Sequence, residues 1–211
     1  MDGKPSTCCM ADIALIHGYA TELSIPGIRK PLGPLGGFLG WSHLAATNRA
    51  AVFHWGIPHT IPIKHLPVPG HVYSLYDLEL RAATSTETTD RLAKWLQTTQ
   101  PKTIVCHSMG CQLLLETLQR NPCTSSVNKI VFLQADISWQ TPLPLVPSVR
   151  WESLYCPWDP TLWLSSMVHR TIRAGLVGLT DTQAQNKLTP LWRLPNLHMS
   201  SMRSKHLANS L

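Results

Sequence analysis

Charged side chains are scarce in this sequence. Asp, Glu, Lys and Arg make up 14% of its 211 residues, while hydrophobic residues make up 44%. An average soluble domain is roughly 25% charged, so the composition argues against intrinsic disorder. No apolar run reaches the roughly 18 residues that cross a bilayer, and residues 1–10 lack the basic-then-apolar order of a secretory signal. We therefore expect a folded, cytoplasmic protein with no membrane span.

Paired cysteine motifs are also missing. The six cysteines show no C-x-x-C spacing and no secretory context, so reduced thiols are expected rather than a disulfide framework. Cys106, His107 and Cys111 are close in sequence, but no second cluster would complete the four ligands of a typical metal site. No metal and no cofactor are predicted.

Basic residues exceed acidic ones without being gathered. Eighteen Lys and Arg against twelve Asp and Glu give a net charge of +6. The longest basic stretch is the broken one from Arg193 to Lys205, and no nucleic-acid-binding motif accompanies it. The charge balance predicts an ordinary surface rather than a nucleic-acid partner.

Short apolar runs alternate with helical patterns along the chain. Buried strands are expected at residues 12–16, 50–55, 103–106, 129–135, 149–156 and 190–194. Helical spacing recurs over 75–99, with the Thr-rich stretch 84–89 as a candidate break, over 109–121, and again from Pro160. This alternation implies parallel pairing through right-handed crossovers. We predict one α/β domain over residues 1–211, with an open, mostly parallel twisted sheet of about six strands covered by helices on both faces.

The third apolar run ends in the sequence Cys106-His107-Ser108-Met109-Gly110. This pattern matches the nucleophile elbow G-x-S-x-G, with Cys in place of the first Gly, between an expected strand and an expected helix. In such an elbow the serine occupies a strained turn, and small residues on both sides relieve contacts with neighbouring strands. Ser108 is therefore the candidate nucleophile. The simpler alternative is that its hydroxyl caps the following helix.

The first run ends in His17-Gly18-Tyr19, where a small residue lets the backbone turn. With this turn, the Ser108 elbow, an acid after a later strand and a histidine near the end, the chain resembles the α/β-hydrolase superfamily from about residue 12 to 211. The resemblance implies a minimal α/β-hydrolase fold and a serine esterase activity. It also implies an oxyanion hole made by backbone amides of Gly18, Tyr19 and Met109.

The family order is nucleophile, acid, histidine. The resemblance places the acid at Asp159, after the fifth strand, and the base at His198, after the last one. Asp136 and His206 are the alternatives, and Asp159 before Pro160 also fits a plain helix N-cap. In the implied mechanism the histidine takes the serine proton, the aspartate orients the imidazole, and water hydrolyses an acyl-enzyme.

The connection Ile137–Ser148 is short and is expected to act as a small cap over an open site. Trp139, Trp158 and Leu143 are the expected walls of an acyl pocket. These apolar walls favour a carboxylic ester with a short to medium acyl chain, on a small-molecule or oligomeric substrate. Thioester, lactone or polyester cleavage, acyl transfer, and binding without catalysis remain alternatives, because one scaffold hosts many chemistries.

Overall fold

The centre of the molecule is a sheet of six parallel strands in the order β3-β1-β5-β6-β7-β8. The computed structural model describes residues 11–18, 23–24, 35–56, 59–60, 69–122, 126–146, 148–189 and 197–210. The strands of the sheet are β1 (Ile13–Ile16), β3 (Ala50–Phe53), β5 (Thr103–His107), β6 (Lys129–Leu133), β7 (Arg150–Tyr155) and β8 (Ala184–Leu188). A separate parallel pair joins β2 (Leu23–Ser24) to β4 (His59–Thr60). The predicted α/β class with an open parallel sheet is confirmed.

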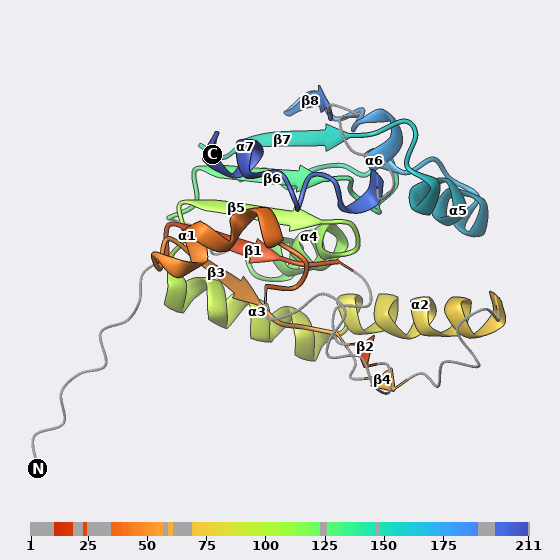
Figure 1. The fold of residues 1–211 in the computed structure, drawn as a ribbon, viewed down its shortest axis with the longest axis horizontal. Coiled ribbons are helices and arrows are strands. Elements are labelled where there is room, and N and C mark those ends of the chain that lie inside the picture. The colour runs from red at the N-terminus through yellow and green to blue at the C-terminus, as the bar shows by residue number, and fades with distance from the viewer. Residues whose placement is uncertain are drawn as a thin grey trace, which may run out of the picture.

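Helices cover both faces of the sheet (Figure 1). They are η1 (Leu39–Trp41), α1 (Ser42–Ala46), α2 (Pro69–Thr84), α3 (Thr86–Thr99), α4 (Gly110–Arg120), α5 (Pro160–His169), α6 (Ala174–Val177), η3 (Leu197–Met199) and α7 (Lys205–Asn209). Alternate side chains of β1 belong to two different hydrophobic clusters, one on each face of the sheet. Ala14 and Ile16 pack with apolar residues of α3 and α4, whereas Ile13 and Leu15 pack with those of η1, α1 and α7. The predicted arrangement of one sheet between two helical layers follows from this alternation.

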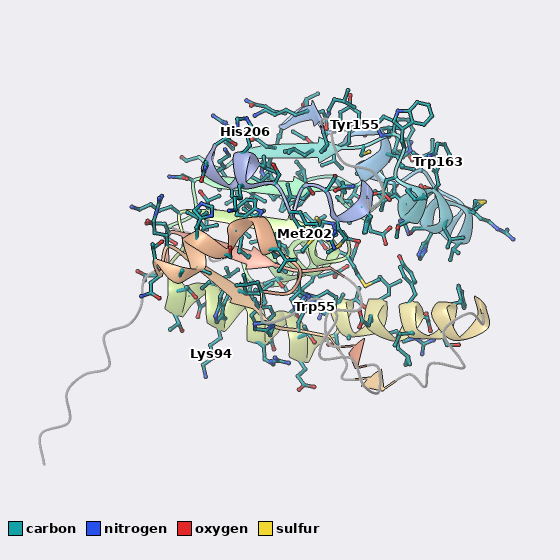
Figure 2. All side chains as sticks on the ribbon, viewed as in Figure 1. Trp55, Lys94, Tyr155, Trp163, Met202 and His206 are labelled. Carbon is teal, nitrogen blue, oxygen red and sulfur yellow. The ribbon has the colours of Figure 1, made fainter. Side chains whose placement is uncertain are left out.

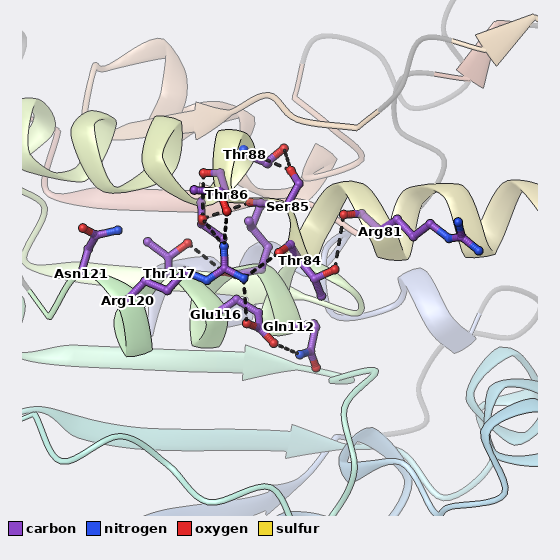
Figure 3. A network of polar contacts seen from close by, with 12 residues as sticks. Arg81, Thr84, Ser85, Thr86, Thr88, Gln112, Glu116, Thr117, Arg120 and Asn121 are labelled. Atoms are coloured by element: carbon purple, nitrogen blue, oxygen red, sulfur yellow. Dashed lines mark hydrogen bonds and ion pairs between the residues drawn. The ribbon is translucent and has the colours of Figure 1, made fainter.

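The helix expected over 75–99 is two helices, because the chain breaks at Ser85 between α2 and α3. The Ser85 hydroxyl accepts a hydrogen bond from the Thr88 amide at 3.2 Å and so caps α3. Arg120, at the end of α4, donates to the carbonyl oxygen of Thr84 at 3.0 Å (Figure 3). Ser and Thr hydroxyls compete for backbone hydrogen bonds, which explains the break inside an otherwise helical pattern.

The sheet has a sixth strand that the sequence analysis did not predict. It is β8, ending at Leu188, while the strand expected at 190–194 lies outside the described residues. β8 is an edge strand with mostly exposed side chains, so it carries no apolar run. Lys187 forms an ion pair with the buried Glu152 of β7, with Nζ 3.0 Å from Oε2. This contact, invisible to a search for apolar periodicity, joins the polar edge strand to the sheet.

The turns that follow β5, β6 and β7 lie at one edge of the sheet, because the three strands are parallel neighbours. In such sheets ligands and chemistry gather at the carboxyl ends of the strands. The described residues of the predicted cap, 137–146 and 148, form neither helix nor strand apart from a single bridge between Ser138 and Arg173. Within the described residues, no helix is long and apolar enough to cross a membrane.

Candidate active site

Ser108 stands between β5 and α4 with a backbone φ of +52°. This left-handed conformation is uncommon for a residue with a side chain and persists only where the surroundings enforce it. Three backbone hydrogen bonds do so. The Ser108 amide donates to Leu133 at 3.1 Å, and its carbonyl accepts from Cys111 at 3.1 Å and from Asp136 at 3.2 Å. The turn is thus tied to β6 as well as to its own helix.

Small residues around the turn allow close backbone approach. A Cβ on Gly110 would collide with the carbonyl oxygen of His17, and one on Gly18 would lie 2.8 Å from the Ser108 Cβ. Cys106, at the position of the motif's first glycine, is fully buried in the sheet. Burial raises the pKa of the Cys106 thiol well above its ordinary value, so the sulfur stays protonated and is a poor nucleophile.

The hydroxyl of Ser108 begins a hydrogen-bonded chain of three side chains. Its Oγ lies 3.0 Å from Nε2 of His198, and Nδ1 of the same ring lies 2.6 Å from Oδ2 of Asp159. The Asp159 side chain is 0% exposed and that of His198 is 13% exposed. The three residues come from the ends of β5 and β7 and from η3, so the fold assembles them from distant parts of the chain.

Asp159 uses its two carboxylate oxygens for different tasks. Oδ1 accepts from the amides of Thr161 and Leu162 and so caps α5, while Oδ2 accepts from His198 and from Gln134. Burial by itself would raise the pKa of Asp159. The hydrogen bond and charge of His198, with the donors from Leu162 and Gln134, outweigh burial and leave the pKa below its ordinary value. The carboxylate is therefore ionised at neutral pH, and Nδ1 of His198 carries the ring proton.

Gln134 is a site residue that the sequence analysis missed. It follows β6 with a φ of +48°, is fully buried, and donates from Nε2 to Oδ2 of Asp159 at 2.8 Å. Its Oε1 accepts from the hydroxyl of Ser201 at 2.7 Å, which fixes the orientation of the amide. The one sequence signal for it is a polar residue near the end of the apolar run 129–135.

His107 contacts the same loop through its own ring. Its Nε2 lies 2.7 Å from the carbonyl oxygen of His198, and because a carbonyl only accepts, this nitrogen carries the proton. Burial, reinforced by the charge of His198, lowers the pKa of His107 to about 3. The ring is therefore neutral at neutral pH and tethers η3 to the elbow through a single hydrogen bond.

His17 supports the turn after β1 in a fixed tautomer. The amide of Trp55 donates to Nε2 of His17 at 3.2 Å, so the ring proton lies on Nδ1, which donates to the carbonyl oxygen of Gly18 at 3.0 Å. The indole of Trp55 stacks on this ring with an interplanar angle of 6°. The Gly18 turn is thereby positioned next to the elbow.

The two alternatives from the sequence lie elsewhere. The carboxylate of Asp136 contacts Arg173 at 3.0 Å, Ser165 at 2.6 Å and Tyr76 at 2.8 Å, away from the imidazole of His198. His206 is an exposed residue of α7 (Figure 2). The geometry therefore brings Asp159 and His198, rather than these two residues, into line with Ser108.

The expected oxyanion and pocket residues differ in whether the structure describes them and in how exposed they are. The amide of Met109 immediately precedes α4, whose N-terminus favours negative charge; Tyr19 lies outside the described residues. Leu143 is buried in the core, Trp139 is half-buried, and Trp158 is 67% exposed. Contact of these three side chains with a substrate stays a prediction.

The fold and the site together define an α/β protein with a hydrogen-bonded Ser-His-Asp chain at the carboxyl edge of a parallel sheet. No protein-family model matches the chain, and no curated protein matches it either. Among the described residues, no three His, Cys, Asp or Glu side chains are grouped so as to hold a metal ion. One fold hosts many activities, so the residues of the site carry the functional assignment.

Proposed function

We propose that this chain is a serine hydrolase of the α/β-hydrolase superfamily that cleaves carboxylic esters. The observation that carries the proposal is the unbroken Asp159–His198–Ser108 hydrogen-bond chain on a serine with positive φ. A helix cap needs neither that conformation nor a histidine on its hydroxyl. The parallel sheet is compatible with the superfamily, and the order nucleophile, acid, histidine is that of its triad.

Each proposed step follows from the protonation states at the site. Ser108 Oγ attacks the ester carbonyl while its proton moves to Nε2 of His198, and Asp159 stabilises the resulting imidazolium. The oxyanion is held by the amide of Met109 and by the turn at Gly18. Collapse of the tetrahedral adduct expels the alcohol, which takes the proton from His198. Water then repeats the sequence, releasing the carboxylic acid and restoring Ser108.

The substrate class rests on the expected apolar walls and the short connection over the site. An uncharged acyl group of short to medium length fits such surroundings better than a charged one, because a charge would be desolvated without a partner. Thioesters and lactones share the same electrophilic carbonyl, so a substrate series is needed to rank them.

The test is labelling with a fluorophosphonate followed by peptide mapping, combined with hydrolysis of p-nitrophenyl esters of increasing acyl length. We expect the label on Ser108 and turnover that is lost in Ser108→Ala. The matched control is Ser42→Ala, which removes an exposed serine of α1 and should keep both label and turnover. Folded protein that takes no label and hydrolyses no ester would overturn the proposal and favour binding without catalysis.

A further inference from the structure

Helix α5 turns its apolar face away from the protein. The exposed fractions are 54% for Trp163, 55% for Leu164, 68% for Met167 and 40% for Val168. These positions are spaced i, i+1, i+4 and i+5, so they share one side of the helix. Figure 2 shows Trp163 at the edge of the molecule. A surface helix normally buries such a stripe, and here the stripe is open.

The polar side of α5 fixes this orientation. Ser165, one of its few buried residues, donates to Asp136 at 2.6 Å and accepts from the guanidinium of Arg173 at 3.0 Å. Nε2 of His169 lies 3.0 Å from the hydroxyl of Tyr76 on α2. Rotating the helix to bury its apolar side would break this network. The buried Asp136–Arg173 ion pair would then lose its hydrogen bonds to Ser165. The outward apolar face is thus enforced by the fold.

The exposed side chains suit an apolar environment. The indole Nε1 of Trp163 already donates to the carbonyl oxygen of Pro157 at 2.8 Å, so the ring can leave water without losing a hydrogen bond. Trp158, in the turn before the helix, is 67% exposed and extends the apolar surface. We call Trp158, Trp163, Leu164, Met167 and Val168 the α5 face.

Next to the α5 face along the chain stands one exposed cation. No Asp or Glu occurs from residue 160 to residue 180, whereas the exposed Arg170 directly follows the helix. An apolar face with tryptophan and an adjoining exposed arginine is typical of helices that lie in the surface of an anionic bilayer. A second copy fits less well, because a standard protein interface uses roughly 20–30 residues a side and two-fold contact across this face would oppose two Arg170 side chains.

We propose that the α5 face docks on the surface of a lipid bilayer that carries anionic headgroups, with the apolar side chains among the acyl chains and Arg170 among the headgroups. Such docking is peripheral and needs no helix that crosses the bilayer. It also requires no ester hydrolysis, so binding tests it whether or not Ser108 is a nucleophile.

The experiment is co-sedimentation of the full chain with phosphatidylcholine vesicles, with and without phosphatidylglycerol. We expect binding that strengthens with the anionic lipid and weakens with salt. The double variant Leu164→Gln/Met167→Gln should bind about tenfold more weakly, since two exposed apolar groups are lost. Arg170→Gln should lose about fivefold on anionic vesicles alone. The matched control is Leu39→Gln in η1, where a leucine with a similar exposure of 52% is removed from another surface.

Three results would overturn the proposal. The first is wild-type protein that stays in the supernatant at low ionic strength, and the second is a double variant that binds as well as Leu39→Gln. The third is a concentration-dependent dimer, seen by analytical ultracentrifugation without lipid, that the double variant abolishes. That third result would assign the α5 face to self-association instead.

Discussion

The Nε2 proton of His107 is donated to the carbonyl oxygen of His198, so the residue before the proposed nucleophile tethers the backbone of the proposed base. This bond crosses from the elbow to η3, and it limits how far the imidazole can move from Ser108. The carbonyl is left without this donor if the ring is replaced by an apolar one.

We predict that His107→Phe lowers kcat for ester hydrolysis by about tenfold, the effect of losing one positioning hydrogen bond. His107→Gln, which keeps a donor, should recover part of the loss. Because the pKa of His107 is about 3, the pH profile of kcat should keep its midpoint in both variants. A shifted midpoint would instead assign His107 a proton-transfer role.

The depressed pKa of His107 also predicts a pH-dependent stability. The unfolded chain binds a proton near the ordinary value of 6.5, while the folded protein resists it down to about 3. The contribution of neutral His107 to the free energy of unfolding is therefore fully present above pH 6.5. It decreases as the pH falls toward 3, by at most about 1.4 kcal/mol per pH unit. Urea unfolding of the wild type and His107→Gln across this window should show a smaller slope in the variant.

The same Asp→Asn substitution should mainly lower activity at one candidate acid and mainly lower stability at the other. We expect Asp159→Asn to lower kcat by about 10³–10⁴ in a protein that still folds, because the amide oxygen can still cap α5 while the NH2 group faces the donors from His198 and Gln134. Asp136→Asn should instead destabilise the fold by about 3 kcal/mol, since it leaves Arg173 buried without its ion pair. Thermal unfolding and p-nitrophenyl ester kinetics on both variants separate the roles, and an inactive but stable Asp136→Asn would reverse the assignment.

The pH dependence of turnover tests the base. A general base must be neutral to accept the serine proton, so kcat/KM should be lower on the acidic side of a pH series and reach a plateau on the alkaline side. The measurement is kcat/KM for one ester over a pH series in which circular dichroism shows an unchanged fold. A rate that does not vary with pH over this series would contradict the role of His198.

The close approach at Gly110 predicts a packing defect. Gly110→Ala places a Cβ against the carbonyl oxygen of His17, and the backbone of β1 must shift to admit it. We expect a loss of about 1–3 kcal/mol in the free energy of unfolding, measured in urea. Ala46→Gly, at an exposed position of α1, is the contrasting change, which alters helix propensity and should cost about 1 kcal/mol or less.

Sequence patterns predicted the parts of the fold that are buried. The central strands β5 and β6 are apolar because helices cover both of their faces, and the Ser108 elbow has a fixed spacing. β8 escaped prediction because an edge strand held by Lys187 needs no apolar run. Gln134 escaped for a different reason: its contact with Asp159 arises from the pairing of β6 with β7, which no local pattern encodes.

The carboxylate of Asp159 connects helix α5 to the imidazole of His198. One oxygen caps the first turn of the helix and the other holds His198, so a displacement of that turn moves the proton-bearing ring as well. A contact that displaces α5 from its outer side would therefore also change the position of His198 relative to Ser108. The side chain of Asp159 therefore links the outer surface of α5 to the position of the His198 imidazole.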